Sequence, residues 1–136
     1  MSTPALICVY EDDMFDEFPL MCIYKHWDGG IESTGKFLAD NFGDFKIVPG
    51  ISASGDHSKE ANGMGCLAAQ IVAKLKDGIG DVYITHYDGD LKRDVVYAYH
   101  IYLRNDELRI WVDRLDLLVY DNPISKFGEW IDKRGE

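Results

Sequence analysis

The chain has little positive charge, no cysteine pairing pattern and no long apolar run. Its 136 residues include 14 Lys and Arg against 24 Asp and Glu, which gives a formal net charge of −10 at pH 7. This balance would repel a phosphate backbone, and no basic stripe offsets it locally. General nucleic-acid binding is therefore disfavoured.

Signals for membrane insertion or export are also missing from the sequence. No apolar run approaches the length that spans a bilayer, and Met1 to Pro4 lack the basic region of a signal peptide. The three cysteines, Cys8, Cys22 and Cys66, have no Cys-x-x-Cys spacing, which argues against a disulfide framework or a structural zinc site. We therefore expect reduced thiols and a cytoplasmic protein, in the host-cell cytoplasm if the chain is viral.

The residues that are present predict a single α+β domain over 1–136. The hydrophobic content of 46% is that of an ordinary globular protein large enough to bury one core. The apolar patterns predict strands at 5–10, 20–27, 81–86, 95–103 and 108–119, the last with a bend near Arg114, and helices at 33–43, from 62 to 77 and after 122. The order β-β-α-α-β-β-β-α favours a mostly antiparallel or mixed sheet with helices packed on one face.

A glycine-rich stretch, Asn62-Gly63-Met64-Gly65-Cys66, opens the longest predicted helix. Glycines there leave backbone N–H donors uncovered, which suits an anion or a carbonyl group. A polar and aromatic cluster, Lys25-His26-Trp27-Asp28-Gly29-Gly30, ends the second predicted strand, and we expect the two clusters to meet. The predicted ligand-binding residues are His26, Trp27, Asp28, Gly29, Asn62, Gly63, Gly65 and Cys66.

Cys66 is also a candidate nucleophile. A thiol in the first turn of a helix has its thiolate stabilised by the helix dipole, and His86 or His26 could act as the base. The alternative is that Cys66 packs as a small hydrophobic side chain beside Ala69 and Ala73, close to the sheet. The packing interpretation is the more frequent one for a cysteine in such a pattern.

Two His-x-Asp strings suggest a possible metal site. His26 and Asp28 end one predicted strand and His86 and Asp88 end another, and residues two apart on a strand project to the same face. Two such ends side by side would provide four ligands. The simpler alternative is that each Asp initiates a glycine turn.

The strings His26-Trp27-Asp28-Gly29 and Asn62-Gly63-Met64-Gly65-Cys66-Leu67-Ala68-Ala69-Gln70, followed by Asp77-Gly78, resemble a group of small uncharacterised proteins found in phage and prophage genomes. The resemblance covers most of the chain from Tyr24 to Leu103. The group has Arg where Lys25 stands and Tyr-Pro where this chain has Gly30-Ile31. The resemblance implies a viral or mobile-element origin, an α+β fold and an accessory role, and it transfers no catalytic residue.

We therefore expect a non-catalytic phage-type accessory protein that binds a small polar or anionic ligand or a host protein, with no cofactor and no membrane partner. One alternative is a cysteine-dependent hydrolase or transferase with Cys66 as nucleophile. Another is an acidic inhibitor that imitates nucleic acid and binds a basic host protein. The sequence is also compatible with a homo-oligomer.

Overall fold

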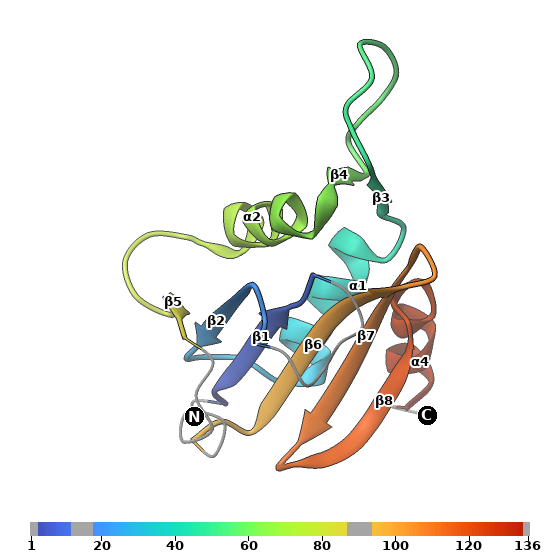
Figure 1. Cartoon of the computed structure of the whole chain (residues 1–136). Helices are drawn as coiled ribbons and strands as arrows, with labels where there is room; N and C mark the ends of the chain where they lie inside the picture. Colours follow the sequence, from blue (N-terminus) through green and yellow to red (C-terminus); the bar gives the residue numbers. More distant parts are fainter. Residues whose placement is uncertain (1–2, 12–17, 87–93, 135–136) are drawn as a thin grey trace.

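The centre of the fold is a mixed six-stranded sheet in the order β5-β2-β1-β6-β7-β8 (Figure 1). The structure is a computed structural model, and it describes residues 3–11, 18–86 and 94–134. The strands are β1 (Ala5–Val9), β2 (Met21–Lys25), β5 (Val82–Thr85), β6 (Tyr97–Arg104), β7 (Glu107–Arg114) and β8 (Leu117–Pro123). β1 and β6 are parallel, and all other neighbours in this sheet are antiparallel.

In the described residues, three α-helices pack on one face of this sheet. They are α1 (Lys36–Phe42), which follows the π-helical turn η1 (Ile31–Gly35), α2 (Gly63–Leu75), and α4 (Phe127–Arg134), which follows the 3-10 turn η2 (Ile124–Lys126). Leu38, Leu67 and Phe127 from these helices are fully buried in one core cluster with the strands. A separate parallel pair, β3 (Lys46–Val48) and β4 (Glu60–Asn62), precedes α2. The protein is thus an α+β domain, as the sequence predicts.

β1 is buried on both faces, which explains its unbroken apolar sequence. Every residue from Ala5 to Val9 has no exposed surface. Ile7 belongs to the core cluster under the helices, whereas Leu6 and Cys8 belong to a second cluster on the opposite face. Central strands that are buried on both faces commonly have such a continuous apolar sequence.

A polar side chain, His100, is also buried on the second face of the sheet. His100 is 2% exposed and its Nδ1 lies 2.8 Å from the Tyr10 hydroxyl. The Trp111 ring stacks on the imidazole with centroids 4.4 Å apart, and the Asp113 carboxylate lies 3.8 Å from Nε2. This face therefore combines an apolar cluster with a buried polar chain.

The last predicted strand is two strands in the structure. Residues 108–119 were expected to form one bent strand, but β7 ends at Arg114 and β8 starts at Leu117. Leu115 and Asp116 between them have φ values of 51° and 65°, the left-handed pair that a tight hairpin turn needs. Leucine is a poor residue for that conformation, so the sequence does not reveal the turn.

Two other local predictions need correction. The predicted helix at 33–43 starts earlier, with η1 at Ile31, and Gly30 precedes it without any side-chain cap. The predicted small-residue seam of α2 does not face the sheet, because Ala69 and Ala73 are exposed. The buried residues of α2 are instead Met64, Leu67, Ala68 and Ile71. Within the described ranges, no helix is both long enough and apolar enough to cross a membrane.

Candidate binding site

The two clusters expected to form one pocket lie at opposite ends of α2. A cavity of about 290 Å³ beside the end of β2 is lined by Lys25 and Asp28, together with Lys74 and Leu75 from the last turn of α2. Asn62 and Gly63 stand at the other end of this 13-residue helix, about 20 Å away at 1.5 Å per residue. The expectation that the clusters meet is therefore wrong, because the C-terminus of α2, and not its N-terminus, lies beside the segment that contains His26.

The first residues of α2 lie in an open environment. Asn62 is exposed and makes no side-chain cap hydrogen bond. A Cβ placed on Gly63 or Gly65 would meet no other atom within 4 Å, and Gly63 needs glycine for its φ of +84°. The side-chain positions of Gly63 and Gly65 therefore face open space and form no pocket wall.

Cys66 is half-buried and packs against the core beneath α2. Its Sγ lies 3.5 Å from Oε1 of Gln70, an amide oxygen that does not act as a general base. Within the described part of the chain, no histidine ring lies within hydrogen-bonding distance of Sγ. His57, which the sequence did not single out, binds Glu60 at 2.7 Å, and this hydrogen bond raises the pKa of His57. The described geometry therefore gives the thiol-catalysis alternative no support.

The two His-x-Asp strings also do not come together. In the antiparallel β2–β5 ladder, Lys25 pairs with Val82 and Cys22 pairs with Thr85. His26 and His86 therefore extend beyond opposite ends of the ladder, about 17 Å apart along the strands. Among the described residues, no group of three or more His, Cys, Asp or Glu could hold a metal ion. Asp88 lies outside the described residues.

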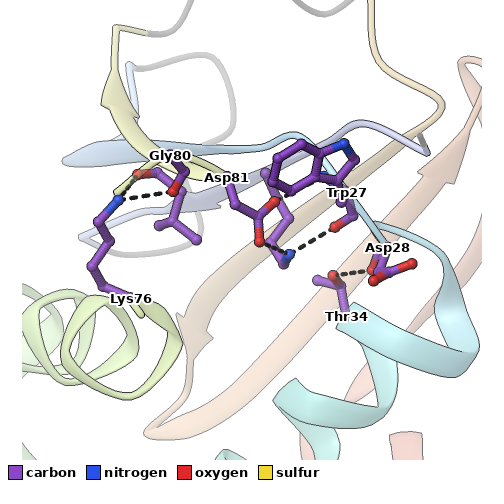
Figure 2. Close-up of polar contacts among 8 residues, drawn as sticks. Trp27, Asp28, Thr34, Lys76, Gly80 and Asp81 are labelled. Atoms are coloured by element: carbon purple, nitrogen blue, oxygen red, sulfur yellow. Dashed lines mark hydrogen bonds and ion pairs between the residues drawn. The ribbon is translucent and has the colours of Figure 1, made fainter. Parts of the chain in front are cut away.

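The His26 segment is anchored to the strand next to it through Asp81. The Asp81 carboxylate pairs with the Lys25 ammonium at 2.5 Å and accepts the Trp27 amide at 2.8 Å (Figure 2). The Asp81 carbonyl accepts the His26 amide at 2.8 Å. Burial favours the protonated carboxyl, but the hydrogen bonds from Lys25 and Trp27 outweigh it, so the pKa of Asp81 lies below its ordinary value.

Residues 27–30 follow, and we call them the 27–30 turn. All four of their carbonyls accept hydrogen bonds. Lys25 Nζ donates to the Trp27 carbonyl, Thr34 Oγ1 to the Asp28 carbonyl and the Tyr99 hydroxyl to the Gly29 carbonyl, each at 2.7 Å. The Gly30 carbonyl accepts the amides of residues 33 and 35 at 3.2 Å. Donors from β2, η1 and β6 thus hold one short backbone segment.

This anchoring maintains an unusual backbone. Asp28 has a φ of +56°, a left-handed conformation that is uncommon for a non-glycine residue. Gly29 fits only without a side chain, because a Cβ there would lie 2.6 Å from Ala5 Cβ and even closer to the Thr3 carbonyl. Unusual backbone that its surroundings over-determine is concentrated at binding sites and active sites.

The turn presents two side chains to solvent. Trp27 is 49% exposed and Asp28 is exposed. Within the residues that the structure describes, neither the indole N–H nor the Asp28 carboxylate has a hydrogen-bonding or ionic partner. A fixed backbone therefore displays a flat apolar surface and a negative charge side by side in the sequence.

Trp27 is also the end of a row of rings, which we call the aromatic row: Trp27, His26, Tyr24 and Tyr83. Successive centroids are 5.1, 5.9 and 6.2 Å apart, and the Tyr24 hydroxyl lies 3.0 Å from His26 Nδ1. Tyr24 and Tyr83 are cross-strand partners on the sheet face away from the α-helices. Tyr83 is 52% exposed, so the row has an exposed ring at each end.

Charges of both signs line the cavity, Lys25 and Lys74 against Asp28. The Lys25 ammonium is already held by Asp81 and the Trp27 carbonyl. The Lys74 ammonium lies 5.4 Å from the centre of the Phe42 ring and 5.7 Å from that of Phe45. Of these three side chains, Asp28 is the one without a described hydrogen-bonding, ionic or ring contact, so the turn itself presents a negative charge.

Several residues that build the site were not identified from the sequence. Thr34, Asp81 and Tyr99 hold the turn together with Lys25, which belongs to the predicted cluster, and Tyr83 extends the aromatic row. Their roles depend on contacts between distant parts of the chain. Gly29 is the exception, because a glycine next to a polar strand end suggests a tight turn. Comparisons with protein-family models, with curated proteins and with solved structures find no match for this chain.

Proposed function

We propose that this protein is a non-catalytic binding module that recognises a partner protein through the 27–30 turn and the aromatic row. The observation that carries the proposal is the turn itself: four successive carbonyls are fixed by hydrogen bonds, while Trp27 and Asp28 stay exposed. A rigid backbone lowers the entropy lost when these side chains engage a partner. Exposed tryptophan and tyrosine are the side chains most often found at the energetic centres of interfaces.

The partner segment would carry arginine or lysine. The Asp28 carboxylate attracts a cation, and the face of Trp27 stabilises a cation placed over it. The Tyr83 ring already does so for the Lys76 ammonium, which lies 5.7 Å from its centre. The net charge of −10 raises the rate at which a basic partner is encountered. Arginine fits best, because its planar guanidinium can stack on a ring and bind a carboxylate through two hydrogen bonds. This proposal keeps the expected accessory role and replaces the expected anionic ligand.

A selection from a random peptide library would test the proposal without a known partner. The full chain is immobilised, and bound peptides from a ribosome-displayed library are sequenced. We expect enrichment of arginine and lysine over the unselected library. The affinity of an enriched peptide is then measured by fluorescence anisotropy for the wild type, Trp27→Ala and Asp28→Asn.

Each of these substitutions should weaken binding at least about tenfold, the loss typical of a central interface residue. Asp28→Asn keeps the backbone, because asparagine tolerates the left-handed conformation. Leu118→Ser at the opposite edge of the sheet is the matched control and should leave the affinity unchanged. Peptides without a basic bias, or equal binding to all four proteins, would refute the proposal.

A further inference from the structure

Cys8 and Cys22 face each other across the first two strands. They are direct partners in the antiparallel β1–β2 ladder, and both point to the face of the sheet opposite the α-helices. Their sulfur atoms are 2.7 Å apart. Direct partners in such a ladder have Cα atoms about 4.5–5.5 Å apart, which is within the range of about 4.4–6.8 Å that a disulfide requires. The backbone therefore need not move for the two sulfurs to bond.

One of the two sulfurs has a route to solvent. Both residues are at most 1% exposed. Cys22, however, lines a cavity of about 250 Å³ at the start of β2, together with Phe18, Leu20 and His86. Phe18 is 84% exposed and Leu20 is 45% exposed, so this cavity lies at the surface. A small reagent can reach Cys22 by displacing these side chains, whereas Cys8 lies in the central strand behind it.

We propose that Cys8 and Cys22 are a redox-active dithiol that is converted to a cross-strand disulfide by exchange with a small disulfide such as oxidised glutathione. The Cys22 thiolate attacks one sulfur of glutathione disulfide, which forms a mixed disulfide and releases one glutathione thiolate. The Cys8 thiolate then attacks Cys22 Sγ in the mixed disulfide and releases the second. The two cysteines lose two protons and two electrons; the glutathione disulfide gains the two electrons, and the two released glutathione thiolates take up the two protons.

The third cysteine provides an internal control. Cys66 is on α2, on the other side of the sheet, and its thiol contacts Gln70. It can form a mixed disulfide with glutathione but has no described thiol beside it to complete an exchange. The two kinds of site therefore predict different products from the same reagent.

Intact-mass spectrometry of Cys66→Ser after incubation with oxidised glutathione tests the proposal. We expect a loss of about 2 Da, which dithiothreitol reverses, because disulfide formation removes two hydrogens. Cys8→Ser and Cys22→Ser, each combined with Cys66→Ser, should show no such loss. Oxidation should also raise the thermal midpoint by about 10 °C, because the bond closes a short loop in the unfolded chain.

Peptide mapping of the wild-type protein keeps the test valid if a double variant does not fold. After the same treatment and alkylation, a non-reducing digest should contain the peptide with Cys8 linked to the peptide with Cys22. Both peptides alkylated in the folded, treated protein would overturn the proposal. A stable glutathione adduct on Cys22 without the linked pair would also overturn it, because Cys8 would then have failed to complete the exchange.

Discussion

Among single residues, Gly29 determines whether the 27–30 turn can form. Its missing side chain lets β1 and the 27–30 turn touch, its amide donates to the Thr3 carbonyl at 2.7 Å, and its carbonyl accepts from Tyr99. Gly30 is its neighbour in sequence but not in environment. Substituting each glycine in turn therefore separates the effect of the close contact at Gly29 from the general effect of replacing a glycine in this segment.

Gly29→Ala should lower the free energy of unfolding by about 1–3 kcal/mol, because the new methyl group overlaps Ala5 and the Thr3 backbone. Gly30→Ala is the matched control: its Cβ would lie 3.9 Å from the Tyr97 ring, and its φ of −68° suits any residue. Urea unfolding of both variants measures the difference. Equal effects from the two substitutions would show that the tight contact at Gly29 is not present in solution.

The charge of Asp81 makes the stability that this turn contributes to the fold depend on pH. Since the folded pKa of Asp81 lies below its unfolded value, the folded state binds fewer protons at this group. Its contribution to stability is therefore complete above the unfolded pKa and is lost as the pH falls through the folded pKa. The side chain is 27% exposed, and its partner Lys25 is 11% exposed, so solvent screens the pair only in part.

Asp81→Asn should lower the free energy of unfolding by about 1–3 kcal/mol near pH 7, the usual value of hydrogen bonds to a charged group. The difference from the wild type should shrink as the pH falls through the folded pKa of Asp81, which lies below the ordinary value for an aspartate. Urea unfolding at a series of pH values checks this. A difference that stays constant with pH would mean that the charge of Asp81 does not stabilise the turn.

At the scale of elements, local sequence signals predicted most helices and strands but not their partners. The hairpin turn between β6 and β7 uses Asn105 and Asp106, and both have the left-handed φ values of 51° and 62° that asparagine and aspartate tolerate. The hairpin turn at Leu115 and Asp116 uses the same conformation with a residue that gives no signal. β3 and β4 pair in parallel over a long separation, which periodicity does not reveal.

The candidate site was half predictable for the same reason. His26, Trp27 and Asp28 were identified because they are polar or aromatic residues at the end of an apolar strand. Their supposed partner at Asn62 was wrong, because nothing local sets the direction in which α2 crosses the sheet. The donors Thr34 and Tyr99 could not be found, since a hydroxyl that fixes a distant carbonyl looks like any other buried polar residue.

Leu115→Asn should raise the free energy of unfolding by about 1 kcal/mol. Leu115 holds a φ of +51°, which costs an ordinary side chain about 1–2 kcal/mol and asparagine less. Its side chain is 59% exposed, so little packing is lost. Leu117→Asn is the control in an exposed strand position and should not stabilise. Thermal and urea unfolding of both variants would decide, and a loss of stability in Leu115→Asn would mean that Leu115 packs on something in solution.

At the scale of the whole molecule, the excess of acids opposes folding while it favours a basic partner. With 24 acidic and 14 basic residues, at least 24 − 14 = 10 acids have no basic residue of their own. The exposed ion pairs that do form, such as Lys133 with Glu129, contribute little to stability because solvent screens them. Repulsion among the remaining carboxylates acts over the whole surface and is reduced by salt, because the Debye length falls to about 8 Å at physiological ionic strength.

Sodium chloride should therefore raise the free energy of unfolding, by an amount on the order of 1 kcal/mol between about 0.02 and 0.3 M, because screening removes more repulsion than attraction. The double variant Glu11→Lys/Asp77→Lys tests the cause: both positions are exposed, and two charge reversals change the net charge from −10 by +4 to −6. This variant should be more stable than the wild type at low salt and should gain less from added salt. Urea unfolding at several salt concentrations measures both slopes. If salt destabilised the wild type, attractive ion pairs such as Lys25 with Asp81 would outweigh the general repulsion, and the acidic surface would cost the fold nothing.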